Sequence, residues 1–417
     1  MYHELIWVLP FIAVLASIAI LPLIQKHWWE KNFPLLCALL SLVVIVRYFL
    51  VLKDSASLIH TAFEYISFIA LIGSLYVVAG GIHINVKGES TPVANCLFLF
   101  IGAVFANLIG TTGASMIFIR PWIRMNKYRL TAYHIVFFIF IISNVGGGLT
   151  PIGDPPLFLG YLKGVPFFWV LKQVWPIWIL AITLLLILFY TVDVQNFKKA
   201  PAAIRQKETS KGEEWKFLGA HNIFFLLMIV GSVFIHHPPF LREAVMILAA
   251  VLSYKTTSKS VHESNDFNFG PIKEVAILFL GIFTTMIPAL AWLEKYANQL
   301  GVNTPGQFYW ASGMLSSVLD NAPTYLSFLS AQMGLFAGTT HFLLETHPIY
   351  IKAISVGSVF FGAVTYIGNG PNFLVKSIAE QYNAKTPSFM AYFFNYSLPI
   401  LIPIFALIWF FFFRMAV

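Results

Sequence analysis

Apolar runs of about twenty residues occupy most of this chain, and they constrain its fold more than any other feature. A helix needs ~20 apolar residues to cross the hydrocarbon of a bilayer, because it rises only ~1.5 Å per residue. The 417 residues are 58% hydrophobic and only 11% charged, whereas soluble domains are about 25% charged. The runs do not alternate apolar and polar residues as the strands of a membrane barrel do. We therefore expect an all-α, polytopic membrane protein.

The apolar runs differ in continuity. Two further segments, 92–125 and 305–340, are apolar but are interrupted halfway by "NLIGTT" and "DNAPT". We expect each to be a re-entrant hairpin that enters and leaves on the same side, because irregular backbone at membrane depth is tolerated only inside protein. The expected spans are 5–25, 34–53, 61–82, 131–165 (broken), 168–192, 217–236, 240–254, 273–293, 350–382 (broken) and 390–413.

Basic residues predict the orientation. If the first hairpin opens to the cytoplasm, that side collects most of the Lys and Arg, including those of the polar segment 196–216. The opposite side keeps few, among them Lys53, Lys163, Arg242, Lys295 and Arg414. This asymmetry predicts both termini outside the cytoplasm of a bacterial-type inner membrane. Topology thus accounts for the formal net charge of +8, and we expect membrane lipid rather than nucleic acid as a partner.

A short pattern occurs twice. "GGLTPIGDPPLFL" at 147–159 aligns without gaps on "GAVTYIGNGPNFL" at 362–374, and seven of thirteen positions are identical. At nearly the same offset, Ala106 and Asn107 face Asp320 and Asn321. Each half has five spans and one hairpin, so an odd number of crossings inverts the second half. We predict two inverted repeats, 1–195 and 217–417, each with a broken fourth span, joined by a cytoplasmic linker at 196–216.

Paired interrupted segments in two halves of a chain are typical of a transporter with a site at the membrane midplane. A broken helix frees backbone carbonyls that can coordinate a small cation, and nearby side-chain oxygens suit sodium. Histidine and cysteine do not occur at zinc-site spacing, and we expect no cofactor beyond the sodium ion. The candidate ion-binding residues are Asn107, Thr111, Thr112, Asn144, Thr150, Asp154, Asp320, Asn321, Thr324, Thr365 and Asn369.

Two carboxylates, Asp154 and Asp320, fall in predicted breaks between apolar helices. An acid inside the membrane indicates function by default. The alternative for each is a cap on a half-helix, because aspartate favours helix N-termini. If a proton and a sodium ion compete for the same carboxylate, that competition alone produces exchange. We expect Asp320 to carry this chemistry, with Asp154 as the second candidate.

At these motifs the chain resembles the ion transporter superfamily, which includes NhaD-type sodium/proton antiporters, the arsenite-pump and P-protein branch, and citrate or dicarboxylate carriers. "SNVGGGLTPIGDPP" resembles the broken-helix loop of NhaD-type antiporters, and "DNAPT" resembles their hairpin tip. The resemblance covers nearly the whole chain. It implies a homodimer with a fixed scaffold, a transport domain that moves as an elevator, and sodium sites between hairpin tips and broken-helix loops.

The favoured function is secondary antiport of sodium or lithium against protons by elevator-type alternating access. The alternative is a sodium- or proton-coupled carrier for citrate or another small carboxylate. The sequence places no Arg or Lys securely at mid-membrane to meet a polyanion, although half-helix N-termini can bind carboxylates unaided. An intramembrane enzyme would need a nucleophile or metal motif, and the sequence carries none, so we do not expect an enzyme.

Overall fold

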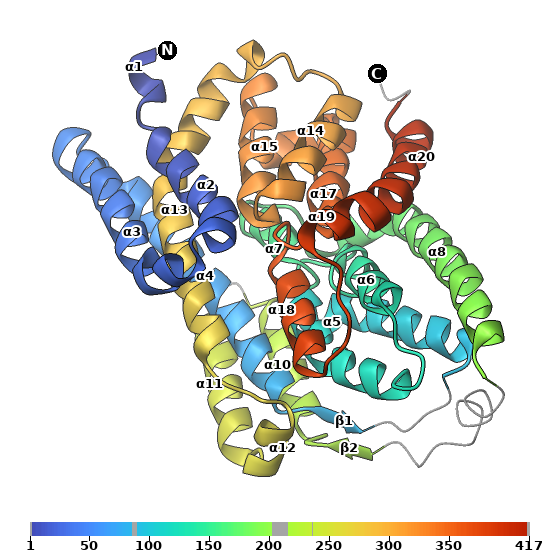
Figure 1. Cartoon of the computed structure of the whole chain (residues 1–417). Coiled ribbons are helices and arrows are strands. Elements are labelled where there is room, and N and C mark those ends of the chain that lie inside the picture. The colour runs from blue at the N-terminus through green and yellow to red at the C-terminus, as the bar shows by residue number, and fades with distance from the viewer. Residues whose placement is uncertain (1, 86–89, 202–215, 236, 415–417) are drawn as a thin grey trace.

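The chain is mostly helical in this computed structural model, which describes residues 2–85, 90–201, 216–235 and 237–414 (Figure 1). The helices of the first half are α1 Tyr2–Leu5, α2 Leu9–Ile24, α3 Lys26–Val46, η1 Arg47–Val51, α4 Ser55–Gly80, α5 Pro92–Met125, α6 Ala132–Ile141, η2 Val145–Gly147, α7 Pro155–Leu162 and α8 Phe167–Lys199. Those of the second half are α10 Asn222–Ser232, α11 Leu241–Thr256, α12 Lys259–Ser264, α13 Gly270–Tyr296, η3 Ala297–Gln299, α14 Pro305–Val318, α15 Asn321–Leu335, α16 Thr340–Thr346, α17 Pro348–Phe361, η4 Gly362–Val364, α18 Gly370–Gln381, α19 Phe389–Tyr392, η5 Phe393–Leu401 and α20 Ile402–Phe412.

One small sheet departs from the all-α expectation. Strand β1, His83–Asn85, pairs antiparallel with strand β2, Lys216–Leu218. Two three-residue strands are too short to show a period of two in the sequence, and only their pairing across the fold defines them. Of the predicted linker 196–216, residues 196–199 continue α8 and Lys216 begins β2, while 202–215 lie outside the described residues.

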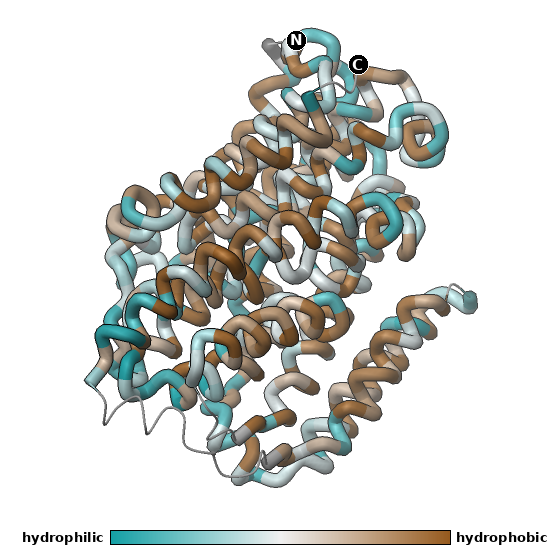
Figure 2. Tube along the Cα trace, turned by 90° about the vertical axis from the view of Figure 1, so that its right-hand side faces the viewer, coloured by the Kyte–Doolittle hydropathy of each residue, from teal (hydrophilic) through white to brown (hydrophobic). Residues whose placement is uncertain are grey.

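The helices are those of a multi-pass membrane protein. Six helices of the described part are long and apolar enough to cross a bilayer, or seven if the bent pair α16 and α17 counts as one span. Other expected spans fall on shorter helices, such as α2 and α10, so the count of ten remains a prediction. Figure 2 shows hydrophobic residues along most helices, with hydrophilic residues gathered toward helix ends and connections. Lipid-facing helices require this pattern.

Helix α5 doubles back on itself. It is kinked at Gly110, whose φ of 76° lies in the left-handed region that favours glycine. The rings of Phe98 and Trp122, on opposite sides of the kink, stack with centroids 5.5 Å apart. Asn95 donates a hydrogen bond to Asn126 at 2.9 Å. The two halves of α5 therefore lie antiparallel, with the kink at the tip.

Helices α14 and α15 form a second helical hairpin. Thr304 and Gln307 make a capping box that begins α14. Only Leu319 and Asp320 separate the end of α14 from the start of α15. Phe308 of α14 contacts Phe328 of α15 with ring centroids 6.1 Å apart. The two helices therefore return alongside each other, as the halves of α5 do.

The helices pack as two groups. The first helix group consists of α2, α3, α4, α10, α11 and α13, which contact one another and lie on the left of Figure 1. The second helix group holds the hairpins and the remaining long helices, and it meets the first where α4 packs on α5 and α13 packs on α15. Within it α6 is buried on every side, with residues 135–142 at most 1% exposed. This agrees with the unbroken apolar run at these positions.

Candidate ion-binding site

Two helices are broken inside the second helix group. α6 ends at Ile141, and the chain passes through η2 and a loop before α7 begins at Pro155. α17 ends at Phe361, and after η4 and another loop α18 begins at Gly370. Most residues of both breaks are buried. The irregular backbone is thus enclosed by protein, the condition under which it is tolerated in a membrane.

Each break contains a close backbone approach that only glycine permits. A Cβ added to Gly153 would overlap the carbonyl oxygen of Gly147, and one added to Gly368 would lie 2.7 Å from the carbonyl oxygen of Gly362. These four glycines are the ones that align between the two similar segments. The aligned sequences therefore fold into similar local structures.

A threonine fastens each break to a hairpin. The Thr150 hydroxyl donates to the carbonyl oxygen of Asn107, and the Thr365 hydroxyl donates to that of Ser317, each at 2.6 Å. Each threonine oxygen also accepts from the backbone N–H three residues later, at 3.1 and 3.2 Å. By these contacts Asn107 in the first half and Ser317 in the second half occupy equivalent positions. The sequence comparison paired Asn107 with Asn321 instead, because it matched side-chain type while the fold matches the backbone position at the end of a half-helix.

Asp154 lies at the centre of the polar residues. Asp154 is only 1% exposed. It accepts hydrogen bonds from the Thr111 hydroxyl at 2.7 Å, from Asn321 Nδ2 at 2.5 Å and from Asn369 Nδ2 at 3.1 Å. These donors come from the α5 tip, the start of α15 and the start of α18. Four segments far apart in the sequence thus converge on one carboxylate, which we call the Asp154 cluster.

Within the part of the chain that the structure describes, the Asp154 cluster has hydrogen-bond donors but no compensating positive charge. No ion pair joins Asp154 to a basic side chain of the described residues, and its three partners are neutral. Asn321 turns its Nδ2 to Asp154, and its buried Oδ1 has no hydrogen-bond partner among the described residues. A buried carboxylate beside an unpaired carbonyl oxygen suits a proton or a hard cation such as sodium.

Asparagine amides extend the cluster. Asn369 Nδ2 also lies 3.2 Å from Asn144 Oδ1, and Asn144 Nδ2 donates to Asn372 Oδ1 at 2.6 Å. Asn372 donates in turn to the carbonyl oxygens of Gly362 and Thr365 at 2.8 and 2.9 Å. Asn372 was missed in the sequence, although it lies one turn after Asn369. It holds the second break in place.

The other predicted residues have more local partners. Asn107 donates to the carbonyl oxygen of Gly146 at 2.6 Å, which ties the α5 tip to the first break. Thr324 donates to the carbonyl oxygen of Asp320 at 2.9 Å within α15. Thr112 is partly exposed and lines a small pocket of about 30 Å³ beside the α5 tip. None of these three side chains hydrogen-bonds to Asp154.

Asp320 caps a helix. It lies at the N-cap of α15, and its Oδ1 accepts from the backbone N–H of Ala322 at 3.0 Å. The residue is partly exposed, unlike Asp154. This hydrogen bond shows that Asp320 caps α15, and its expected role in binding a proton or a cation stays a prediction. Its neighbour Asn321, and not Asp320 itself, reaches the Asp154 carboxylate.

A family model described as "Putative citrate transport" matches residues 2–413. The chain belongs to that family. No curated protein matches it. Family membership and the polytopic helical fold together identify a membrane transporter rather than an enzyme.

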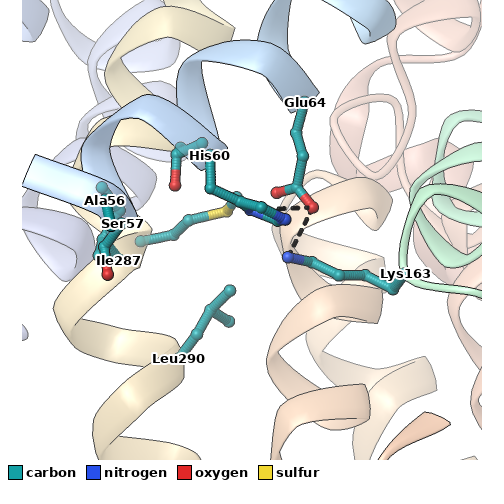
Figure 3. Close-up of a pocket in the computed structure, with 9 residues that line it drawn as sticks. Ala56, Ser57, His60, Glu64, Lys163, Ile287 and Leu290 are labelled. Atoms are coloured by element: carbon teal, nitrogen blue, oxygen red, sulfur yellow. Dashed lines mark ion pairs between the residues drawn. The ribbon is translucent and has the colours of Figure 1, made fainter. Parts of the chain in front are cut away.

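A second pocket of about 430 Å³, distinct from the Asp154 cluster, lies at the end of α7 in this transporter and is lined partly by polar side chains. Glu64 of α4 and Lys163, which follows α7, point toward each other there (Figure 3), with Nζ and Oε1 2.7 Å apart. His60 Nδ1 lies 3.6 Å from the same Oε1. Met286, Ile287 and Leu290 of α13 form an apolar wall. The ion pair joins the second helix group to the first.

Proposed function

We propose that this transporter exchanges sodium for protons, with Asp154 as the carboxylate that binds the two in turn. The observation that carries the proposal is a nearly fully buried carboxylate with neutral partners and no paired basic side chain among the described residues. An isolated negative charge in such a place is too costly to persist. It needs a proton or a metal cation, and the competition between them couples their transport.

In this proposal the protonated and sodium-bound forms use the same groups. Asp154, Asn321 Oδ1 and the Thr111 hydroxyl supply oxygen atoms to sodium, and Asn369 keeps the carboxylate oriented through its amide. When a proton replaces sodium, the cluster is again neutral. Asp320 serves as the cap that places Asn321, a supporting role rather than the leading one expected from the sequence.

The two similar breaks support an inverted repeat. Thr150 and Thr365 make the same pair of contacts, and the aligned glycines make the same close approach. We further propose that the first helix group is the scaffold of a homodimer and that the second moves as an elevator. The first helix group would then stay fixed in the inner membrane. The second helix group would carry the Asp154 cluster from one side of the membrane to the other.

Proteoliposomes containing the purified protein test the proposed exchange. Sodium added to vesicles with a preformed pH gradient should collapse that gradient. Asp154→Asn should lower the exchange rate at least ~100-fold, because losing about 3 kcal/mol of cation binding corresponds to that factor. Asp320→Asn should retain both exchange and thermal stability, because asparagine caps a helix as well as aspartate does. Glu345→Gln, at a residue whose side chain is 68% exposed, is the control and should behave as wild type.

A second candidate, sodium- or proton-coupled transport of citrate, is favoured by the description of the family. The starts of α7, α15 and α18 meet at the Asp154 cluster, and helix N-termini attract carboxylates. The same vesicles decide between the two candidates. If sodium leaves the pH gradient unchanged while citrate drives sodium or proton entry, citrate transport replaces sodium/proton exchange as the function.

A further inference from the structure

Three fully buried polar side chains follow one face of α15, beginning with Asn321 of the Asp154 cluster. Asn321, Tyr325 and Gln332 are each 0% exposed. At ~100° per residue they lie within about 40° of one another around the helix axis. α15 packs against α17 and α7, and α7 lies at the foot of α15 in Figure 1. We call these three residues the α15 polar row.

Each member of the row has one polar atom without a hydrogen-bond partner among the described residues. These atoms are Asn321 Oδ1, the Tyr325 hydroxyl and Gln332 Oε1. The other ends of the two amides are used, since Asn321 Nδ2 donates to Asp154 and Gln332 Nε2 donates to the carbonyl oxygen of Tyr350 at 2.8 Å. Buried polar groups are nearly always paired with protein or ordered water. Three unpaired atoms on one face therefore indicate water.

Tyr325 lies between α7 and polar side chains of α17. A Cβ added to Gly160 of α7 would lie 2.5 Å from the Tyr325 hydroxyl oxygen, so this hydroxyl sits in the contact between α7 and α15. Ser355 of α17 interacts with this hydroxyl, and because the Ser355 hydroxyl donates its own proton to the carbonyl oxygen of Ile351 at 2.7 Å, its oxygen can only accept from Tyr325 or from water. The Ser358 hydroxyl, one turn along α17, has no partner among the described residues either. A purely apolar seam would not carry these groups.

The row reaches from the Asp154 cluster to the far end of the second hairpin. Gln332 follows Asn321 by eleven residues, which is about 16 Å along a helix. That distance is about half of a ~30 Å hydrocarbon core. Beyond Gln332, the partly exposed Tyr350 donates through its hydroxyl to the carbonyl oxygen of the exposed Asn303. The polar groups thus lead from the buried carboxylate to the surface.

We propose that the α15 polar row is a hydrated proton path between Asp154 and the end of the hairpin formed by α14 and α15. Water molecules supply the missing partners of the row. The Tyr325 hydroxyl accepts a proton from water on one side as it gives its own to water on the other, so it is unchanged after each transfer. The inference rests on the proposed function, because a proton path serves a site that exchanges protons.

Substitutions that remove the polar atoms and keep the size test the path. Tyr325→Phe and Gln332→Met should each slow sodium/proton exchange in proteoliposomes by about tenfold or more. The half-saturating sodium concentration should stay as in wild type, because neither residue hydrogen-bonds to Asp154. Tyr309→Phe is the matched control. Tyr309 is also 0% exposed, but its hydroxyl is paired with the carbonyl oxygen of Phe405 at 3.1 Å. This variant should lose stability and keep its exchange rate.

A second measurement does not depend on transport. Hydroxyl radicals generated by X-rays from internal water should label Tyr325 in the purified wild-type protein and should leave Tyr309 unlabelled. If wild type exchanges sodium for protons, an unchanged rate in Tyr325→Phe overturns the path and leaves the proposed function standing. If wild type does not exchange them, the proposed function fails, and labelling still decides whether the row is hydrated. Absence of label on Tyr325 overturns the path in either case.

Discussion

Asp154 and Asp320 show that residue type alone does not assign a role in a broken helix. Both are aspartates beside the start of a half-helix. Asp320 is partly exposed and accepts a backbone hydrogen bond from its own helix. Asp154 is buried and faces side chains of three other segments. A change in the charge of the Asp154 carboxylate therefore affects several elements at once.

The close backbone approach at Gly153 and Gly368 leads to a testable prediction about single residues. Gly153→Ala and Gly368→Ala should each lower the free energy of unfolding by about 2 kcal/mol or more, because the new Cβ meets a backbone carbonyl oxygen that cannot rotate away. Thermal unfolding of purified protein in detergent measures the loss.

Gly231→Ala supplies the control for this measurement. Gly231 lies in α10, and a Cβ added there meets nothing within 4 Å. The change should be neutral or stabilising by up to about 1 kcal/mol, because alanine favours a helix. Equal losses at Gly231 and Gly153 would contradict the close approach described for the breaks.

At the scale of elements, α7 links the candidate site to the first helix group. Asp154 precedes its first residue, and Lys163 follows its last. Lys163 pairs with Glu64 of α4, and the Tyr161 hydroxyl donates to the carbonyl oxygen of Val233 beyond α10 at 2.8 Å. Both ends of this short helix are therefore held. If the Asp154 cluster and α7 move together relative to the first helix group, the contacts of Tyr161 and Lys163 with that group must break.

The Glu64–Lys163 pair should be measurably coupled. A double-mutant cycle with Glu64→Gln and Lys163→Met, measured by thermal unfolding, should give a coupling energy of about 1 kcal/mol between the two side chains. This value is at the upper end of the range for exposed ion pairs. The Glu64 side chain is only 9% exposed, while that of Lys163 is 27% exposed, so solvent screens the pair in part. The same cycle on Glu4 and Lys295, whose side chains are 43% and 58% exposed, should give almost no coupling. A larger coupling energy for Glu4 and Lys295 than for Glu64 and Lys163 would contradict the conclusion that the Glu64–Lys163 pair holds the end of α7.

At the scale of the whole molecule, α1 and the end of α20 lie toward one end, and β1, β2 and α12 lie toward the other (Figure 1). The basic residues Arg120 and Arg124 belong to the part of α5 near the sheet, where Arg124 Nη1 lies 3.4 Å from His83. The positive-inside rule assigns such an end to the cytoplasm. The orientation with both termini outside the cytoplasm stays a prediction, and the position of these two arginines agrees with it.

Reporter fusions test this orientation. Alkaline phosphatase fused after residue 417 should be active in cells and green fluorescent protein at the same place should be dark, because the first matures outside the cytoplasm and the second folds inside it. The same reporters inserted within 202–215 should give the reverse pattern. A fluorescent fusion after residue 417 would place the C-terminus in the cytoplasm and invert the proposed topology.

The sequence by itself determined the class of protein and the positions of its breaks. Apolar runs must form helices in lipid, and glycine and proline interrupt them at 147–156 and 362–371 whatever the neighbours are. The kink in α5 and the turn before α15 also followed from local residue types. These features depend on a few consecutive residues, which is why a single sequence was enough.

Only the tertiary structure decided which polar residues meet. Asp154, Thr111, Asn321 and Asn369 are up to 258 residues apart in the chain, since 369 − 111 = 258, and no local pattern records that their side chains touch. The contribution of Asn372, the pairing of Asn107 with Ser317, and the unpaired atoms along α15 arise in the same way. Whether a polar side chain caps its own helix or serves a shared site depends on the helix packed against it.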